Sequence, residues 1–221
     1  MAEASLTKQD LGELPRKGKW EVFDLMRGSH RVAIFLSTLF NPLVYCTLFL
    51  GALAFWRSAW AWRLLVVWLG LVAGPATLLY WGHARGIWSD WDVSRREERR
   101  TYMPGVVGFA GVTAASAWGF QFPAVLRFSV LAIAIWLVLS TVVGFWWKIS
   151  LHVGGTVGIA GLAALVWGLN RALVVAWVPV AVAWARLVLK RHTWDQVIAG
   201  AFAGAIALAI AWLSWGPTIG L

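Results

Sequence analysis

Long apolar runs alternate with short polar segments along the chain. The runs lie at 32–56, 60–82, 104–121, 124–147, 153–169, 172–189 and 196–215. Each is close to the ~20 residues that a helix needs to cross the hydrocarbon core of a bilayer. The division of the stretch 104–147 rests on the turn signal at Gln121–Pro123. The pattern predicts an all-α, polytopic transmembrane helix bundle with six or seven membrane spans.

The first thirty residues differ from the rest of the chain. Residues 1–30 are polar and of mixed charge, and the stretch 20–26 has the pattern of a short helix lying on the membrane surface. No signal-peptide pattern precedes a cleavage site. The chain is therefore divided into a polar N-terminal segment, 1–30, and a transmembrane domain, 31–221.

The composition supports this division and limits the classes of binding partner that are expected. The chain is 60% hydrophobic and 13% charged, which excludes an ordinary soluble domain. Its 18 tryptophans gather near the ends of apolar runs, where the bilayer headgroups lie. The only cysteine, Cys46, excludes an internal disulfide framework and a cysteine-based metal site. The net charge of +9 comes from residues between the runs, so anionic lipid is expected as the partner and nucleic acid is not.

Three polar breaks between the runs carry the candidate chemistry. They are His83–Met103, Lys148–His152 and Lys190–Asp195. Because two spans separate each break from the next, all three are expected on the same side of the membrane.

The second and third breaks each contain a histidine accompanied by basic residues. His152 stands at a predicted helix start beside Ser150 and Lys148, where free N–H groups and the helix dipole attract anions. His192 follows Arg186 by six residues. One neutral imidazole can attack phosphorus while a second protonates the leaving alkoxide. The alternative is an interfacial histidine and an ordinary basic flank of the last helix.

The first break is rich in arginine, between Asp90 and Pro104. Arginine suits a phosphoryl group because two parallel N–H donors match two oxygens. The alternative is a solvated or headgroup-binding charge run whose carboxylates pair locally with arginines.

Together these residues resemble the type 2 phosphatidic acid phosphatases, the integral-membrane branch of the superfamily that includes vanadium haloperoxidases. The family pattern is Lys-x6-Arg-Pro, then Pro-Ser-Gly-His, then Ser-Arg-x5-His-x3-Asp. Arg186-x5-His192 matches the third motif at the family spacing, with Ala185 in place of serine. The segment 150–152, Ser-Leu-His, matches the second motif with leucine in place of glycine.

The first motif is matched least well. Arg99 takes the arginine position, while Asp92 falls at the lysine position and Arg100 at the proline position. Arg95, Arg96 or Lys148 would supply the missing lysine charge. The resemblance covers roughly residues 85–210.

The resemblance implies a role for each matched residue. His192 would be the nucleophile that forms a phosphohistidine, and His152 would protonate the leaving lipid alcohol and then activate water. The phosphate-binding residues that it implies are Arg99, Arg186, Lys148, Ser150 and Arg96. No metal and no cofactor is implied.

The aspartate that orients the nucleophile in the family is displaced in this chain. Its position falls on Gln196, and Asp195 lies one residue earlier. We expect Asp195 to orient His192 as the third catalytic residue. The alternative is that the Gln196 carbonyl oxygen fixes the tautomer of His192 without stabilising an imidazolium charge.

The function expected from the sequence is therefore a membrane-embedded lipid phosphate phosphatase. Its candidate substrates are polyprenyl phosphates or diphosphates, phosphatidic acid and phosphatidylglycerol phosphate, and no protein partner is implied. A non-catalytic protein that binds anionic lipid through its basic face is the main alternative; a lipid-linked transferase and a transporter are weaker ones. We expect a bacterial or archaeal cell membrane, with the active site facing the cytoplasm by the positive-inside rule.

Overall fold

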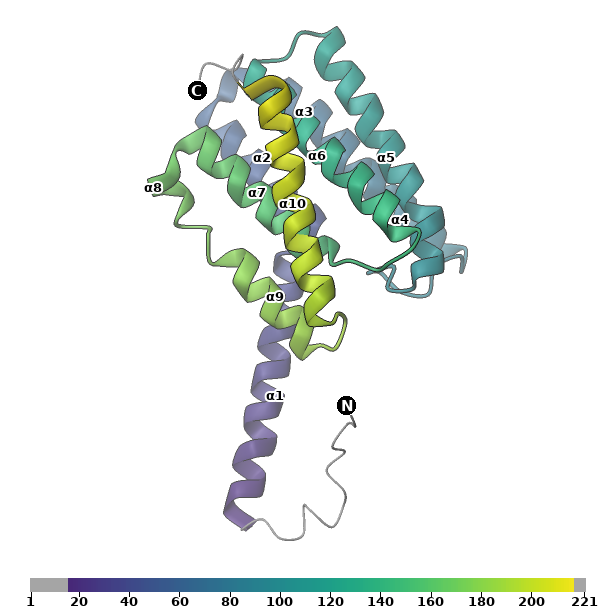
Figure 1. Ribbon diagram of the computed structural model, residues 1–221, viewed down its shortest axis with the longest axis vertical. Coiled ribbons are helices and arrows are strands. Elements are labelled where there is room, and N and C mark those ends of the chain that lie inside the picture. Colours follow the sequence, from purple (N-terminus) through teal and green to yellow (C-terminus); the bar gives the residue numbers. More distant parts are fainter. Residues whose placement is uncertain (1–15, 217–221) are drawn as a thin grey trace.

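The computed structural model describes residues 16–216, with side chains from residue 28 onward. This part of the chain is helical and has no β-strand (Figure 1). Two short segments, η1 (Ser58–Trp60) and the π-helical η2 (Leu69–Ala73), flank α3. In chain order the α-helices are α1 (Arg16–Leu39), α2 (Pro42–Trp56), α3 (Ala61–Trp68), α4 (Gly74–Ala84), α5 (Arg96–Gly119), α6 (Ala124–Gly144), α7 (Leu151–Trp167), α8 (Leu169–Ala172), α9 (Val178–Val188) and α10 (Trp194–Trp215).

Several helices are long and apolar enough to cross a bilayer. They are the continuous helix Ser58–Ala84, then α6 and α10. The pair α1–α2 adds a fourth span if its two parts, bent by 56° at the break before Pro42, are counted together. Among the described residues α7 and α9 are shorter apolar helices. The all-α membrane architecture is confirmed, whereas length and composition give three or four spans, fewer than the six or seven expected.

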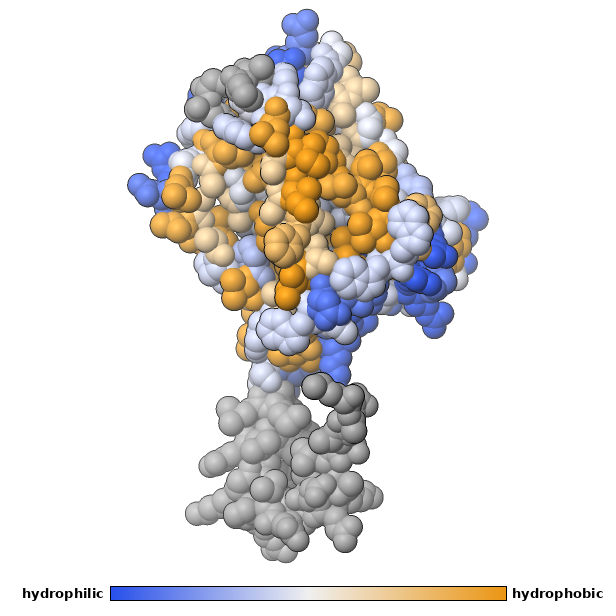
Figure 2. Space-filling model, in the orientation of Figure 1, coloured by the Kyte–Doolittle hydropathy of each residue, from blue (hydrophilic) through white to orange (hydrophobic). Residues whose placement is uncertain are grey.

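Apolar side chains cover the middle of the bundle, and hydrophilic ones gather toward its ends. In Figure 2 a broad apolar surface extends over α10 and the neighbouring helices, with hydrophilic residues below it. This is the distribution expected of a helix bundle surrounded by lipid, because the hydrocarbon core solvates apolar groups and excludes charge.

Three boundaries differ from those expected. α5 begins at Arg96, so the charged stretch 96–100 forms its first turns instead of a polar break. Glu97 and Glu98 lie in that first turn, where the helix dipole stabilises negative charge. The stretch 172–189 is helical as α9 only over 178–188. α1 runs through the expected boundary at residue 30, while residues 1–15 of the polar segment lie outside the described residues.

Glycines allow α7 and α10 to approach each other closely. A Cβ atom at Gly200 would overlap the carbonyl oxygen of Ser150, and one at Gly204 would overlap that of Gly154. Small residues at such positions let membrane helices pack backbone to backbone. The contact fixes the first turn of α10 beside the N-terminus of α7, where two of the three polar breaks meet.

We predict that Gly200→Ala destabilises the protein by about 1–3 kcal/mol, because the methyl group overlaps backbone that has no room to move. Thermal unfolding in detergent measures the effect. Gly158→Ala is the matched control, since a Cβ there has no neighbour within 4 Å. Equal unfolding temperatures for the two variants would contradict the close contact.

Candidate functional site

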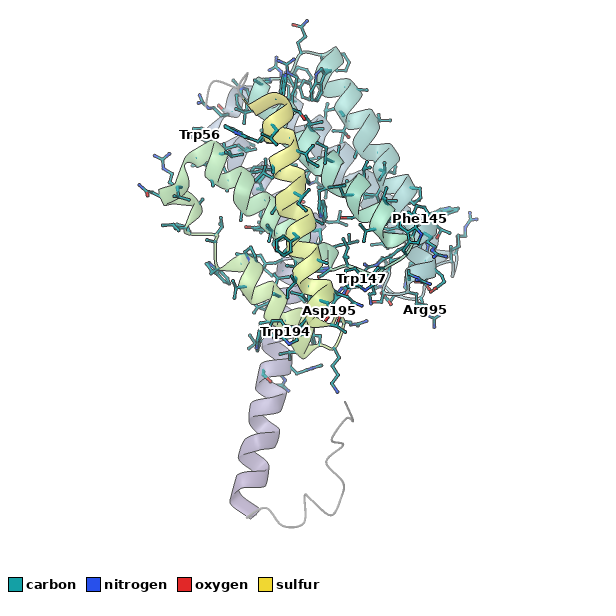
Figure 3. The ribbon with its side chains drawn as sticks, in the orientation of Figure 1. Trp56, Arg95, Phe145, Trp147, Trp194 and Asp195 are labelled. Carbon is teal, nitrogen blue, oxygen red and sulfur yellow. The ribbon has the colours of Figure 1, made fainter. Side chains whose placement is uncertain are left out.

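The three polar breaks lie at the same end of the bundle. Figure 3 labels Arg95 in the first break, Trp147 next to the second, and Trp194 and Asp195 at the third, and these lie close to one level below the apolar middle. Trp56 is at the other end.

Hydrogen bonds join the breaks directly. Arg99 Nη1 donates to the carbonyl oxygen of Ile149 at 2.9 Å, which links the first break to the second. Lys148 Nζ donates to the carbonyl oxygen of Arg191 at 3.1 Å, which links the second to the third. Arg191 Nη1 in turn donates to Ser94 Oγ at 3.2 Å and links the third to the first. The breaks therefore form one site.

Arg186, near the end of α9, lies at the centre of this site and is 1% exposed. Its Nη1 donates to Asp92 Oδ2 at 2.8 Å and to Ser37 Oγ of α1 at 2.9 Å. Its Nε is also buried and has no hydrogen-bond partner. A buried donor without a partner is costly, and a ligand oxygen would satisfy it.

His192 lies beside Arg186, in the turn between α9 and α10, and is buried. Its Nδ1 is 3.0 Å from Gln196 Oε1, which also accepts from the backbone N–H of Thr193 at 3.4 Å. The second bond fixes the oxygen of the amide on this side, so Nδ1 carries the hydrogen and Nε2 keeps its lone pair. Nε2 is buried and has no partner.

The charge state of His192 follows from its surroundings. Burial, followed by the positive charges of Arg186 and Arg99, lowers the pKa of His192 from 6.5 to about 3. The imidazole is therefore neutral at ordinary pH. A neutral ring with an unpartnered, buried Nε2 is the form of histidine that can act as a nucleophile.

Asp195 is not the partner of His192, contrary to expectation. It is exposed in the first turn of α10, and its Oδ2 lies 3.4 Å from Thr193 Oγ1. Gln196 takes the place beside the ring because it belongs to a capping box with Thr193, which turns the Gln196 side chain back toward the start of the helix.

His152, in the first turn of α7, is the second buried histidine. Its Nε2 is 3.4 Å from Asn41 Nδ2 and 3.9 Å from Asp92 Oδ1. Asn41 is the N-cap of α2, and its Oδ1 accepts from the backbone N–H of Leu43 at 3.0 Å. The bend between α1 and α2 thus brings a polar side chain to His152.

Ser150 is fully buried and is the N-cap of α7, where its Oγ accepts from the backbone N–H of Val153 at 3.4 Å. Its own N–H donates to the carbonyl oxygen of Gln196 at 3.0 Å, so the first turns of α7 and α10 lie against each other. Two helix N-termini then direct the positive ends of their dipoles to the same place.

Arg99 and Lys148 add positive charge. Arg99 is buried, and besides Ile149 it donates through Nε to the carbonyl oxygen of Val93 at 2.8 Å. Burial, followed by the charges of Arg99, Arg186 and Arg191, lowers the pKa of Lys148. Cations that depress one another's protonation favour binding of an anion, which relieves the repulsion.

Arg96, expected to bind phosphate, is directed elsewhere. Its Nη1 donates to the carbonyl oxygen of Trp146 at 2.9 Å, and its Nε lies 3.7 Å from Glu97 Oε1 at the surface. Arg100 contacts the carbonyl oxygen of Phe145 in the same way. Both arginines hold the chain that follows α6, and neither is brought to the histidines.

An apolar cavity of about 120 Å³ opens from the site into the bundle. Asn41, Asp92 and His152 line its polar end, and side chains such as Leu71, Met103 and Leu208 line the rest. Its size is close to that of cavities that accept a benzene-sized apolar group. A polar headgroup at the histidines could therefore have its hydrocarbon directed between the helices.

Three residues of the site were not predicted as such. Asp92 was placed only as a departure from the lysine position, and Ser37 and Asn41 lie before the stretch that the resemblance covers. The dipeptide Asn41-Pro42 is a readable helix start, and it signals the bend. Nothing in the sequence indicates that Asn41 reaches His152.

Among the residues that the structure describes, no group of three or more His, Cys, Asp or Glu side chains is arranged to hold a metal ion. Comparison of the chain with protein-family models, with curated proteins and with solved structures finds no match.

Proposed function

We propose that the protein is a membrane-embedded, metal-independent lipid phosphate phosphatase that works through a phosphohistidine. One observation carries the proposal. His192 Nε2 and Arg186 Nε are both buried without a hydrogen-bond partner within a cluster of cations. A phosphoryl group at this place would accept from Arg186 and present its phosphorus to His192. The resemblance to type 2 phosphatidic acid phosphatases supports the same roles.

The geometry supports the following steps. Arg186, Arg99 and Lys148 hold the phosphate oxygens, with N–H groups at the start of α7 as further donors. His192 Nε2 attacks phosphorus, a P–N bond forms and the P–O bond to the lipid alcohol breaks. His152 gives a proton to the leaving oxygen and later takes one from water. The water oxygen then bonds to phosphorus, the P–N bond breaks and phosphate is released.

The part of the lipid tail next to the phosphate would enter the apolar cavity. The rest would extend into the surrounding lipid, so the substrate need not leave the bilayer. Polyprenyl phosphates or diphosphates, phosphatidic acid and phosphatidylglycerol phosphate remain the candidate substrates. We further propose that the shorter helices complete six or seven spans in a bacterial or archaeal membrane. The site would face the cytoplasm by the positive-inside rule. Basic residues gather in the N-terminal segment and at the end of the bundle that holds the site.

The proposal is tested by phosphate release from a panel of lipid phosphates, with the purified protein in detergent and EDTA. Acid quenching during turnover should trap a phosphate on His192, which mass spectrometry locates. Absence of release from every lipid, or release that EDTA abolishes, would contradict the proposal. In that case binding of anionic lipid without turnover becomes the better function.

Gln196→Glu places a carboxylate against His192 Nδ1 and preserves the capping box, which glutamate also forms. We predict a roughly tenfold faster reaction near pH 7, because the carboxylate stabilises the positive charge that develops on the ring during attack. The same carboxylate raises the pKa of His192 from about 3. Since the neutral ring is the nucleophile, loss of activity on acidification should begin at a higher pH in the variant.

The measurement is the ratio of kcat/KM between variant and wild type at each pH from about 4 to 9, which cancels titration of the substrate. Asp195→Asn, at the exposed neighbouring position, is the control and should give a flat ratio. A flat ratio for Gln196→Glu as well would mean that the amide plays no part in the reaction.

A further inference from the structure

Asp92 occupies a place where a substrate oxygen is expected. Its Oδ2 contacts Arg186 Nη1 at 2.8 Å, and its Oδ1 lies 3.9 Å from His152 Nε2. In the proposed function these two groups hold the phosphate and protonate the leaving oxygen. The Asp92 carboxylate therefore lies beside both groups that should contact the phosphoryl group. The carboxylate and the phosphoryl group are both negatively charged.

The position of Asp92 is fixed by the loop before α5. Asp90 Oδ1 accepts from the backbone N–H groups of Asp92 and Ser94, at 2.8 and 3.2 Å. Val93 is buried and adopts a φ of 46°, a conformation that β-branched residues rarely take. Its carbonyl oxygen accepts from Arg99 Nε. Asp92 is thus held in place by a strained and well-bonded loop, unlike a carboxylate on a mobile surface segment.

Asp92 is ionised in this position. Burial raises its pKa, but the electrostatic interactions with His152 and Arg186 and the hydrogen bond from Arg186 outweigh burial and lower the pKa below its ordinary value. The titratable and charged groups that face it come from every side of the site. They are Arg186 of α9, Arg191 after α9, His152 of α7 and Arg99 of α5.

We infer that Asp92 is a specificity-determining residue that makes the site select a phosphoryl group bearing one negative charge over one bearing two. The inference rests on the proposed function, which places the phosphoryl group between Arg186 and the two histidines. A second negative charge on the ligand would lie a few ångströms from a fixed carboxylate with little water between them. Coulomb repulsion at that separation is large enough to reduce binding by at least about tenfold.

Two kinds of lipid phosphate carry a single charge. One is a phosphodiester, which is a monoanion at every ordinary pH. The other is a phosphomonoester below its second pKa of about 6. The chemical steps are the same for both, since the P–O bond to the lipid alcohol breaks as the P–N bond to His192 forms and water later replaces the histidine.

The test compares dodecyl phosphate with its methyl ester, dodecyl methyl phosphate, on the full-length protein in detergent. Dodecanol release gives kcat/KM for each, and the ratio of diester to monoester cancels general effects of a variant. In the wild type this ratio should rise about tenfold per pH unit above about pH 6, where the monoester becomes a dianion. Asp92→Asn should lower the ratio at about pH 8.5 by at least about tenfold.

Glu97→Gln is the matched control, because Glu97 is an exposed carboxylate at the surface of the same segment. It should leave the ratio unchanged. The pH series on the wild type needs no variant, so it still tests the charge selection if Asp92→Asn does not fold. A ratio that neither rises with pH nor falls in Asp92→Asn would overturn the inference.

A binding measurement separates this inference from the proposed function. Dodecylphosphonate and its monomethyl ester are not hydrolysed at the P–C bond, and each should raise the unfolding temperature when it binds. At about pH 8.5 the monoanionic ester should bind the wild type at least about tenfold more tightly, and Asp92→Asn should remove the difference. If the protein binds with this preference but hydrolyses nothing, charge selection holds and the phosphatase proposal fails. If Asp92→Asn bound both ligands more tightly by the same factor, Asp92 would only compete with the ligand for Arg186 and would not distinguish the charge of the ligand.

Discussion

His192→Ala is expected to lower kcat for lipid phosphate hydrolysis by at least about 10⁴-fold, because it removes the proposed nucleophile. Removing a nucleophile from a site whose residues act together costs a large part of the whole rate enhancement. The fold should survive, since the ring gives up one hydrogen bond, to Gln196. The measurement is kcat for the best lipid phosphate, with thermal unfolding of the same preparation.

The control for this variant is His30→Ala, because His30 is exposed on α1 and outside the site. It should keep wild-type activity. If His192→Ala retained activity within about tenfold of the wild type, another residue would be the nucleophile. Trapping the covalent phosphate in the wild type would then locate that residue.

Arg186→Ala is expected to reduce both stability and activity. The guanidinium is buried, and its loss leaves Asp92 as a carboxylate without its ion-pair partner. Because the Asp92 side chain is 24% exposed, the cost should be below the about 3–5 kcal/mol of a fully buried pair. Activity should fall by about 10³-fold or more, because the phosphate loses its central donor. Arg171→Ala, at an exposed position in α8, should change neither property.

A double variant separates the two effects of Arg186. Removing the Asp92 charge together with Arg186, as Arg186→Ala with Asp92→Asn, should recover part of the lost stability because no unpaired carboxylate remains. Activity should stay low, since the phosphate donor is still missing. If the double variant were as unstable as the sum of the single variants, the ion pair would not be the source of the loss.

The fold was readable from the sequence to the extent that hydropathy determines it. Apolar runs mark the helices because each must satisfy its backbone groups internally in lipid. Hydropathy does not distinguish a charged helical turn from a charged loop, which is why the start of α5 at Arg96 was missed. It also does not show that residues 173–177 form turns before α9.

The site was predictable where its residues keep a fixed spacing. The spacing between Arg186 and His192 corresponds to one turn that joins two helices, and both residues are buried together. The choice between Arg96 and Arg99 was not predictable, because residues three apart on a helix lie on neighbouring faces and only the packed bundle separates them. The choice between Asp195 and Gln196 was readable, since Thr193-x-x-Gln196 is the sequence of a capping box.

The hydrogen bond between Ser37 and Arg186 joins residues 149 positions apart, and it has a consequence for biosynthesis. A nascent chain that ends before α9 has Asp92 and Ser37 in place but lacks both Arg186 and His192. Helices α1 to α7 are therefore synthesised before the centre can be completed. The cluster of Arg186, His192, Asp92 and Ser37 forms only when the last two helices have left the ribosome and docked against the first. Under the proposed function, chain completion therefore precedes any contact with lipid phosphate at His192.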